Sequence, residues 1–375
     1  MATVAEPARE ARNPDLTREF RRPDLARAIL DRIKARLTAA QPLRLMEVCG
    51  THTVAISRSG LRSLLGPEVD LVSGPGCPVC VTSQGDIDAM LELAGRSGVI
   101  VATYGDMVRV PGSRRSLLEA RAAGARVEVV YSALDAVRLA AANPGDKVVF
   151  LGVGFETTAP GTALAMEAAE HEGVRNFLIY SAHKLVPPAL AALVADPELG
   201  IAGFILPGHV SVVIGRRAYL EPLAARRIPA AIAGFEPVDI LLAVDRMAEM
   251  LGAGRTEVAN AYARAVAEEG NPLARAAIER CFVPVTATWR GLGEIPGSGL
   301  ALRPHLAARD AREKLGVAAR EAPDPPGCSC GDVLRGKIKP TACPLFGGPC
   351  TPTAPVGPCM VSTEGACAAY YRYER

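Results

Sequence analysis

Between about residue 43 and residue 235, the sequence repeats one pattern that strongly limits the possible folds. A short apolar run rich in β-branched residues leads to a turn marked by Gly or Pro, and then to an amphipathic stretch rich in Ala and Leu. Strands that are apolar throughout and alternate with helices are typical of parallel sheets covered on both faces. The predicted strands are LRLMEV, VDLVSG, GVIVATY, RVEVVY, KVVFLGV, NFLIYSA, IAGFILP and IPAAIAG.

The chain of 375 residues is long enough for two or three domains. All predicted strands could share one sheet, but we predict an α/β fold with two doubly wound parallel-sheet domains, over residues 23–130 and 131–235. After residue 235 the alternation stops, so residues 236–375 are predicted to form a mainly helical and irregular C-terminal domain. A polar extension, residues 1–22, precedes these three domains.

Local signals mark several helices and one further element. Ser132 with Asp135 three residues later has the pattern of a capping box, and Pro237 is expected at the first turn of another helix. The segment TATWRGLGEIPGSGLALRP is expected to form a hairpin or an irregular segment.

Charge and hydropathy exclude several classes of partner. The chain has 42 basic and 40 acidic residues in a mixed order, which disfavours binding to nucleic acid. No apolar run reaches the ~18 residues that a membrane span needs, and the N-terminus lacks the pattern of a secretory signal. We therefore expect a cytoplasmic protein without a membrane partner. In that compartment thiols stay reduced, so the ten cysteines are expected to serve metal or redox chemistry.

Six of the ten cysteines lie in the last 48 residues, among many Gly and Pro residues. They are Cys328, Cys330, Cys343, Cys350, Cys359 and Cys367. Zinc sites usually pair their ligands as Cys-x2-4-Cys, and this tail has no such pair. The long, uneven intervals favour a 4Fe-4S cluster, which is held by four thiolates. Zinc remains the alternative, and spacing alone does not choose four ligands from six.

Three more cysteines follow predicted strands. Cys49 follows LRLMEV, and Cys77 and Cys80 follow VDLVS as a Cys-x-x-Cys motif suited to two-electron thiol exchange. The carboxyl ends of parallel strands form ligand crevices, so these thiols are candidate functional groups. Cys49 with His52 would offer a thiolate and an imidazole to a transition metal. The competing interpretation of a single cysteine, such as Cys49 here, is a small buried apolar side chain.

Other polar motifs end strands at the same predicted edge. Glu156 lies in GFETTAP, His209 in PGHVS and Asp106 in TYGDMVRVPGS. Because loops at this edge converge, we expect a shared site to which these three residues belong. A His or Glu near a turn is also commonly a cap or a solvated side chain. Cys281 has no nearby partner and is interpreted as a core residue.

Taken together, the motifs MEVCGTHT, SGPGCPVC, TYGDMVRVPGS, GFETTAP, PGHVS, WRGLG and GPCMVSTEGACAAYY resemble the signatures of the HypD family of hydrogenase maturation proteins. The resemblance runs from Cys49 to Tyr371. In that family the cluster ligands follow Cys-x14-Cys-x6-Cys-x16-Cys. By this likeness the ligands here are Cys328, Cys343, Cys350 and Cys367.

The resemblance implies a scaffold for metallocofactor assembly rather than a conventional turnover enzyme. An iron carrying cyanide and carbon monoxide would be built on it, before delivery to the large subunit of nickel-iron hydrogenase. A HypC-type chaperone and a HypE-type cyanide carrier would be its partners. Cys49 would bind the iron, with His52 beside it, and Cys77 and Cys80 would stand between that site and the cluster. Some relatives have a second His where this chain has Val54, which leaves a mechanism with two imidazoles in doubt.

The sequence leaves two other functions open. One is a cluster-dependent thiol–disulfide oxidoreductase that uses Cys77 and Cys80. The other is a zinc-stabilised module that binds proteins without redox chemistry.

Overall fold

The computed structural model of the chain describes residues 18–37 and 42–374. Its larger sheet has five parallel strands in the order β2-β1-β7-β8-β9. The strands are β1 (Leu43–Glu47), β2 (Val69–Ser73), β7 (Gly203–Pro207), β8 (Ala230–Ala233) and β9 (Val258–Asn260). Leu45 of β1 is in register with Leu71 of β2 and Gly203 of β7. The side chains of Leu45 and Met46, which are neighbours in β1, pack into two different hydrophobic cores on opposite faces of the sheet. The sheet is therefore buried on both sides.

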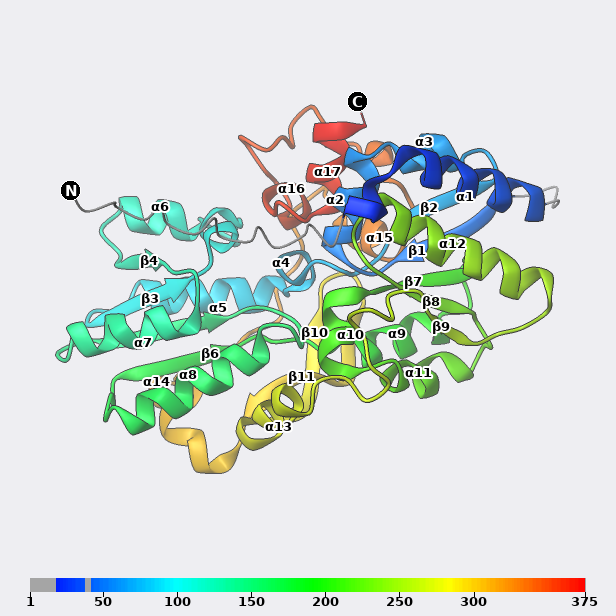
Figure 1. Ribbon diagram of the computed structural model, residues 1–375. Coiled ribbons are helices and arrows are strands. Elements are labelled where there is room, and N and C mark those ends of the chain that lie inside the picture. The colour runs from blue at the N-terminus through cyan, green and yellow to red at the C-terminus, as the bar shows by residue number, and fades with distance from the viewer. Residues whose placement is uncertain (1–17, 38–41, 375) are drawn as a thin grey trace, which may run out of the picture.

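Helices cover both faces of this sheet (Figure 1). The helices around Leu45 are α1 (Pro23–Arg36), α2 (Gly50–Arg58), α3 (Leu61–Leu65) and α12 (Pro237–Gly252). The elements on the opposite side are α9 (Val186–Ala195), α10 (Gly208–Ile214), η3 (Arg217–Tyr219) and α11 (Leu220–Ala224). A short helix η1 (Arg18–Arg21) precedes α1. Residues 1–17 of the predicted extension lie outside the described residues.

Four parallel strands form the smaller sheet, in the order β4-β3-β5-β6. They are β3 (Val99–Thr103), β4 (Val127–Val129), β5 (Lys147–Gly152) and β6 (Phe177–Ser181). The helices of this part are α4 (Pro78–Val81), α5 (Gln84–Ala94), η2 (Gly105–Arg109), α6 (Leu117–Ala122), α7 (Ala133–Ala142) and α8 (Ala159–His171). Both parallel sheets of the predicted α/β fold are therefore present, and each has helices on both faces.

The strands pair differently from the expected division between residues 23–130 and 131–235. The chain leaves the larger sheet after β2, builds the whole smaller sheet, and returns at β7. β3 thus pairs with β5 and β1 with β7, across the expected boundary. The physical reason is that parallel strands are joined by crossovers, so the strand–helix alternation does not specify which strands are neighbours.

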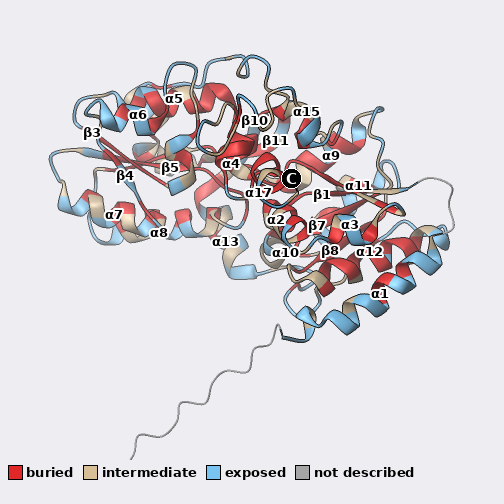
Figure 2. Ribbon diagram, turned by 90° about the horizontal axis from the view of Figure 1, so that it is seen from above, coloured by how far each residue is buried: buried red, intermediate tan, exposed pale blue. Residues whose placement is uncertain are grey.

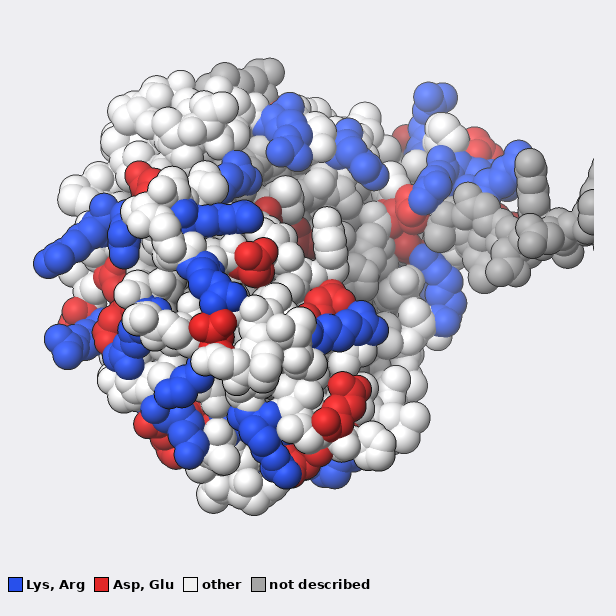
Figure 3. All heavy atoms as spheres, turned by 90° about the vertical axis from the view of Figure 1, so that its left-hand side faces the viewer, with Lys and Arg blue, Asp and Glu red and all other residues white. Residues whose placement is uncertain are grey.

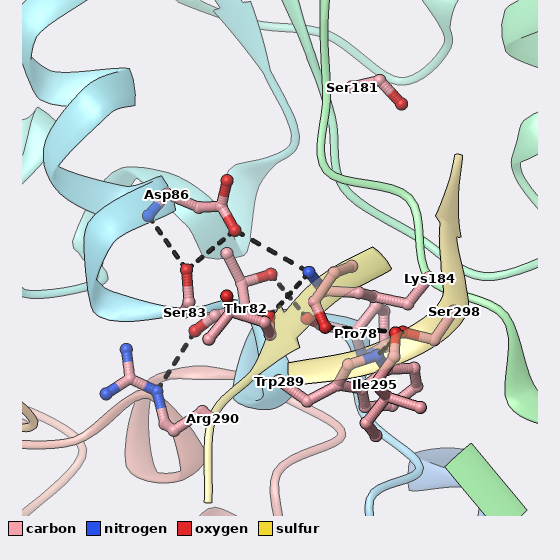
Figure 4. A network of polar contacts seen from close by, with 12 residues as sticks. Pro78, Thr82, Ser83, Asp86, Ser181, Lys184, Trp289, Arg290, Ile295 and Ser298 are labelled. Atoms are coloured by element: carbon pink, nitrogen blue, oxygen red, sulfur yellow. Dashed lines mark hydrogen bonds and ion pairs between the residues drawn. The ribbon is translucent and has the colours of Figure 1, made fainter. Parts of the chain in front are cut away.

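The predicted hairpin is formed by β10 (Phe282–Trp289) and β11 (Gly293–Leu302), which pair antiparallel. Lys184, after β6, donates a hydrogen bond from Nζ to the Thr288 carbonyl at 2.9 Å, and its Nζ lies 3.7 Å from Asp86 Oδ2 (Figure 4). Lys184 and Asp86 are both buried, and their ion pair joins α5 to the segment that follows β6. The hydrogen bond from Lys184 to Thr288 joins that segment to the hairpin.

Part of the expected C-terminal domain belongs to the larger sheet, because α12 packs on it and β9 extends its edge. β9 has only three residues and was not predicted from the sequence. The other elements of this region are α13 (Pro272–Cys281), η4 (Pro304–Arg309), α14 (Ala311–Leu315), α15 (Cys330–Leu334), η5 (Pro340–Ala342), α16 (Pro358–Val361) and α17 (Ala366–Tyr373). No helix within residues 18–37 and 42–374 is long and apolar enough to cross a lipid bilayer.

The predicted helix starts are confirmed. Ser132 and Asp135 form a capping box at α7, with Ser132 Oγ accepting from the Asp135 amide at 3.2 Å, and α12 begins at Pro237. These signals act within one turn of helix, so the local sequence is sufficient to predict them.

One core connects the two parallel sheets. It contains Phe204 of the larger sheet, Tyr180 of the smaller sheet, and cysteines from both ends of the chain. Figure 2 shows the buried strands between helices whose outer faces are exposed. On the surface shown in Figure 3, basic and acidic side chains are interspersed, as their mixed order in the sequence suggests.

Candidate functional site

The ends of β1 and β2 bring Cys49 and Cys77 onto neighbouring loops. Cys49 is the residue before α2, and Cys77 is the residue before α4. The Gly50 amide donates a hydrogen bond to the Gly76 carbonyl at 2.9 Å. A Cβ on Gly76 would lie 2.1 Å from the Cys49 nitrogen, so this contact requires glycine. Parallel pairing of the two strands therefore places the two cysteine loops against each other.

A cavity of about 740 Å³ lies where loops of the two parallel sheets meet. Its polar lining includes Cys49, Thr51, Asp106, His209 and Glu364. Four of these follow strands of the larger or the smaller sheet, and Glu364 comes from the C-terminal region. The carboxyl ends of strands in both sheets thus contribute to one crevice, as expected for open α/β sheets.

Cys49 lines this cavity and is 8% exposed. Burial raises its pKa to about 12, the backbone of His52 opposes the increase, and the negative charge of Glu364 adds to it. The thiol therefore keeps its proton at neutral pH until a cation takes the proton's place, since metals bind the thiolate.

His52 and His209 both stack on Phe235, but only His209 lines the cavity. The ring centroid of Phe235 lies 4.7 Å from that of His52 and 3.9 Å from that of His209. His52 is fully buried, with its Nε2 2.8 Å from the Gly234 carbonyl and with no hydrogen-bond partner for its Nδ1 among the described residues. Burial lowers the pKa of His52 to about 4 and also lowers the pKa of His209. Both imidazoles are therefore neutral at neutral pH.

Asp106 lines the cavity, but its carboxylate is already engaged. Its Oδ2 accepts hydrogen bonds from the Thr363 amide at 2.9 Å, the Thr363 hydroxyl at 3.1 Å and the Ser362 hydroxyl at 3.2 Å. Arg109 in the same motif donates to the Val361 carbonyl at 3.1 Å. The motif around Asp106 therefore holds the C-terminal segment 361–363 against the smaller sheet.

Glu156 lies behind the cavity wall rather than in it. Its Oε1 accepts a hydrogen bond from the Val186 amide at 2.9 Å, and its Oε2 has no partner among the described residues. Burial raises the pKa of Glu156 to about 7. This predicted site residue is thus close to the shared site without touching the cavity.

Glu364 is a candidate site residue that the sequence analysis missed. Its Oε1 accepts a hydrogen bond from the Thr51 hydroxyl at 2.7 Å, beside Cys49. A Cβ on Gly50 would lie 2.5 Å from the Glu364 Cβ, so the two segments are in close contact. The available signal was the position of Glu364 in the motif GPCMVSTEGAC, between Cys359 and Cys367.

Cys77 and Cys80 form a disulfide across α4. Both are buried in the core that connects the two parallel sheets. α4 contacts α16, which carries Cys359. The disulfide therefore lies between the loop of Cys49 and the C-terminal cysteines.

All six C-terminal cysteines line one internal space of about 10 Å³. The other residues lining it include Val333, Leu345, Phe346 and Met360, and none is His, Asp or Glu. The sulfurs of Cys330 and Cys359 lie 2.7 Å apart. The pKa of Cys330 lies well below its ordinary value because of hydrogen bonds with Cys328 and Cys359, and the charge of Arg290 also lowers it.

The donor chemistry of this space fits an iron–sulfur cluster. A structural zinc site needs four donors around one ion, whereas a 4Fe-4S cluster distributes its four thiolates over four irons. Six thiols around one apolar space match the donor set of a 4Fe-4S cluster, which uses four of them.

The fold and the site define a class of α/β protein in which a crevice containing one cysteine, a Cys-x-x-Cys motif and a group of six cysteines lie close together. The family described as "HypD: Hydrogenase formation hypA family" matches residues 24–374. A Rhodobacter capsulatus protein named hydrogenase maturation factor HypD is 48% identical over 368 residues, covering 95% of this chain and 97% of that protein. The Escherichia coli (strain K12) protein of the same name is 47% identical over 339 residues, with 90% and 91% covered. The chain belongs to the HypD family of hydrogenase maturation factors.

Proposed function

We propose that this chain is the scaffold on which the Fe(CN)2CO group of nickel-iron hydrogenase is assembled. The observation that carries the proposal is the cavity that presents the Cys49 thiol, the His209 imidazole and the Glu364 carboxylate together. Membership of the HypD family supports a role in hydrogenase maturation, and the cavity beside Cys49 supports a binding place for iron. Iron that carries cyanide and carbon monoxide suits a soft thiolate ligand, so Cys49 is its ligand from this chain.

The groups around Cys49 are suited to exchanging a thiol proton for an iron ion. Because burial raises the pKa of the thiol to about 12, binding of iron has to displace the proton. Glu364 and the neutral His209 line the same cavity and are the candidate acceptors of that proton. His52 does not line the cavity, but its Nδ1 has no partner among the described residues, and it is the second imidazole near Cys49 that could take up the proton.

The Cys77–Cys80 pair is suited to the reductive release of cyanide. A thiocyanate on a HypE-type carrier reacts with the reduced pair, so that the S–CN bond breaks and the Cys77–Cys80 disulfide forms. The products are the carrier thiol and hydrogen cyanide, which keeps the atoms and the two electrons in balance. Cyanide then binds the iron as its anion and releases a proton. The position of α4 beside the loop of Cys49 supports this role.

Cys328, Cys343, Cys350 and Cys367 would hold the resident 4Fe-4S cluster, with Cys330 and Cys359 beside them. Such a cluster, when bound, supplies one-electron transfer. The contact of α4 with α16, which carries Cys359 of the same cysteine group, supports electron transfer from such a cluster to the disulfide that must be reduced in each cycle.

A HypC-type chaperone would share the iron with Cys49, a HypE-type carrier would bring cyanide, and the hydrogenase large subunit would receive the product. Infrared spectroscopy of the complex with the chaperone tests this proposal. Cys49→Ala should abolish the cyanide and carbonyl bands while cluster absorbance stays unchanged. Retention of both bands in this variant would remove Cys49 from the iron site.

The disulfide also favours a second function, a cluster-dependent thiol–disulfide oxidoreductase. Under this alternative, Cys77 and Cys80 would reduce disulfides of thioredoxin-like proteins without added iron. Turnover of such a substrate by Cys49→Ala at the wild-type rate would support the alternative, because only the scaffold function needs Cys49.

A further inference from the structure

Arg290, in the motif WRGLG, is a buried cation with no role in the proposed assembly steps. It follows the last residue of β10, and its side chain is 1% exposed. Its Nη1 pairs with the carboxylate of Asp324, whose side chain is 41% exposed. Water screens the half-exposed carboxylate more than the buried guanidinium, so a positive field remains on the interior side.

Arg290 binds the last residue of α4, the helix that begins after Cys77 and contains Cys80, and the residues that follow it. Its backbone amide donates to the Val81 carbonyl at 2.9 Å, and its Nε donates to the Thr82 carbonyl at 3.2 Å (Figure 4). Its Nη2 donates to Gln84 Oε1 at 3.1 Å. One guanidinium thus fixes the end of α4 and the start of α5.

The turn that carries Arg290 also packs on the cysteine cluster. A Cβ on Gly291, which has a φ of 77°, would lie 2.5 Å from the Gly331 Cα, so the two backbones touch beside Cys330. Arg290 therefore contacts the end of α4 directly, and its neighbour Gly291 contacts the backbone next to Cys330.

We propose that Arg290 is a positioning residue that raises the reduction potential of the cluster site and holds that site against the Cys77–Cys80 helix. The inference rests on the proposed function, because it assumes that the C-terminal thiols hold a cluster. Reduction adds one electron to the cluster and breaks no protein bond. The reduced cluster is more negative by one charge, so a nearby buried cation stabilises it relative to the oxidised cluster.

The test is a redox titration of the anaerobically reconstituted full chain, with dithionite as the one-electron donor and electron paramagnetic resonance as the readout. Arg290→Met should shift the midpoint potential to more negative values. Arg290→Lys, which keeps the charge, should stay closer to the wild type. Asp324→Asn should shift the potential in the positive direction, because it leaves the buried guanidinium without its counter-charge.

Arg309→Met is the matched control, because Arg309 is also buried and pairs with Glu170 at 2.8 Å, on the smaller sheet. It should lower stability without moving the potential. A purely structural role for Arg290 predicts a lower cluster content with an unshifted potential, and that result would overturn the inference. If Arg290→Met fails to fold, an unshifted potential in Asp324→Asn overturns it instead. Absence of a cluster from the wild type would refute the proposed function itself.

Discussion

The hydroxyl of Thr51 donates a hydrogen bond of 2.7 Å to the carboxylate of Glu364, from 313 residues away in the sequence. Thr51 lies two residues after Cys49, and Glu364 lies three residues before Cys367. The contact therefore joins the candidate iron ligand to the segment between two C-terminal cysteines. Ser362, Thr363 and Glu364 of this segment form part of the cavity wall.

Asp106 is predicted to hold that segment in place. Asp106→Ala removes the acceptor of hydrogen bonds from Ser362 and Thr363. The free energy of unfolding should fall by about 2 kcal/mol, because hydrogen bonds to a charged acceptor are lost. Hydrogen exchange measured by mass spectrometry should show faster exchange in residues 360–366.

Asp88→Ala is the matched control, since Asp88 accepts hydrogen bonds from the Ser113 amide at 2.7 Å and hydroxyl at 2.6 Å. It should destabilise the chain to a similar extent and leave exchange in residues 360–366 unchanged. Unchanged exchange in Asp106→Ala as well would contradict the tethering role.

The ligand set predicted by the resemblance can be tested one thiol at a time. Cys343→Ala should abolish the visible absorbance of the cluster, because one of four iron-binding thiolates is lost. Cys281→Ala removes a buried cysteine of α13 outside the cysteine-lined space and should keep full absorbance. A fully retained cluster in Cys343→Ala would mean that Cys330 or Cys359 belongs to the ligand set.

Features that depend on neighbours in sequence were predictable from the sequence. The predicted strands, the capping box at Ser132 and the helix start at Pro237 all appear in the structure. The pairing of β3 with β5 was not predictable, because it is decided by packing between segments far apart in the chain. β9 was missed because three residues carry too little of a pattern.

The candidate site was also only partly predictable from the sequence. The rule for parallel strands correctly placed Cys49, His209 and Asp106 around one crevice, because each follows a strand. The rule does not say which side chains turn inward, and Glu156 lies behind the wall. Glu364 lies on no strand end, so only the folded chain reveals its contact with Thr51.

Glu156 should make stability depend on pH. Its folded pKa of about 7 lies above its ordinary value of 4.5, so the folded chain keeps a proton that the unfolded chain releases. The contribution of Glu156 to stability is therefore fully present below pH 4.5 and is lost as the pH rises through 7. Glu156→Gln should be more stable than the wild type at pH 8, on the order of 3 kcal/mol from the pKa difference.

Chemical denaturation at several pH values measures this effect. The stability difference between Glu156→Gln and the wild type should be smallest at pH 4.5 and largest above pH 7. A difference that does not change over this range would show that burial does not perturb the carboxyl group of Glu156.

The dithiol step requires the thiols of both Cys77 and Cys80. Cys77→Ser and Cys80→Ser should each block cyanide addition to the iron completely, because neither single thiol can form the intramolecular disulfide. Iron bound at the cluster should be unchanged in both variants. Infrared bands of cyanide at wild-type intensity in either variant would refute the two-electron role of the pair.

Anaerobic purification followed by iron, acid-labile sulfide and zinc analysis tests the central claim, that the C-terminal thiols hold a redox-active cluster. The account predicts about four irons and about four sulfides per chain, with no stoichiometric zinc. Stoichiometric zinc without sulfide, in protein that still supports hydrogenase maturation, would contradict it.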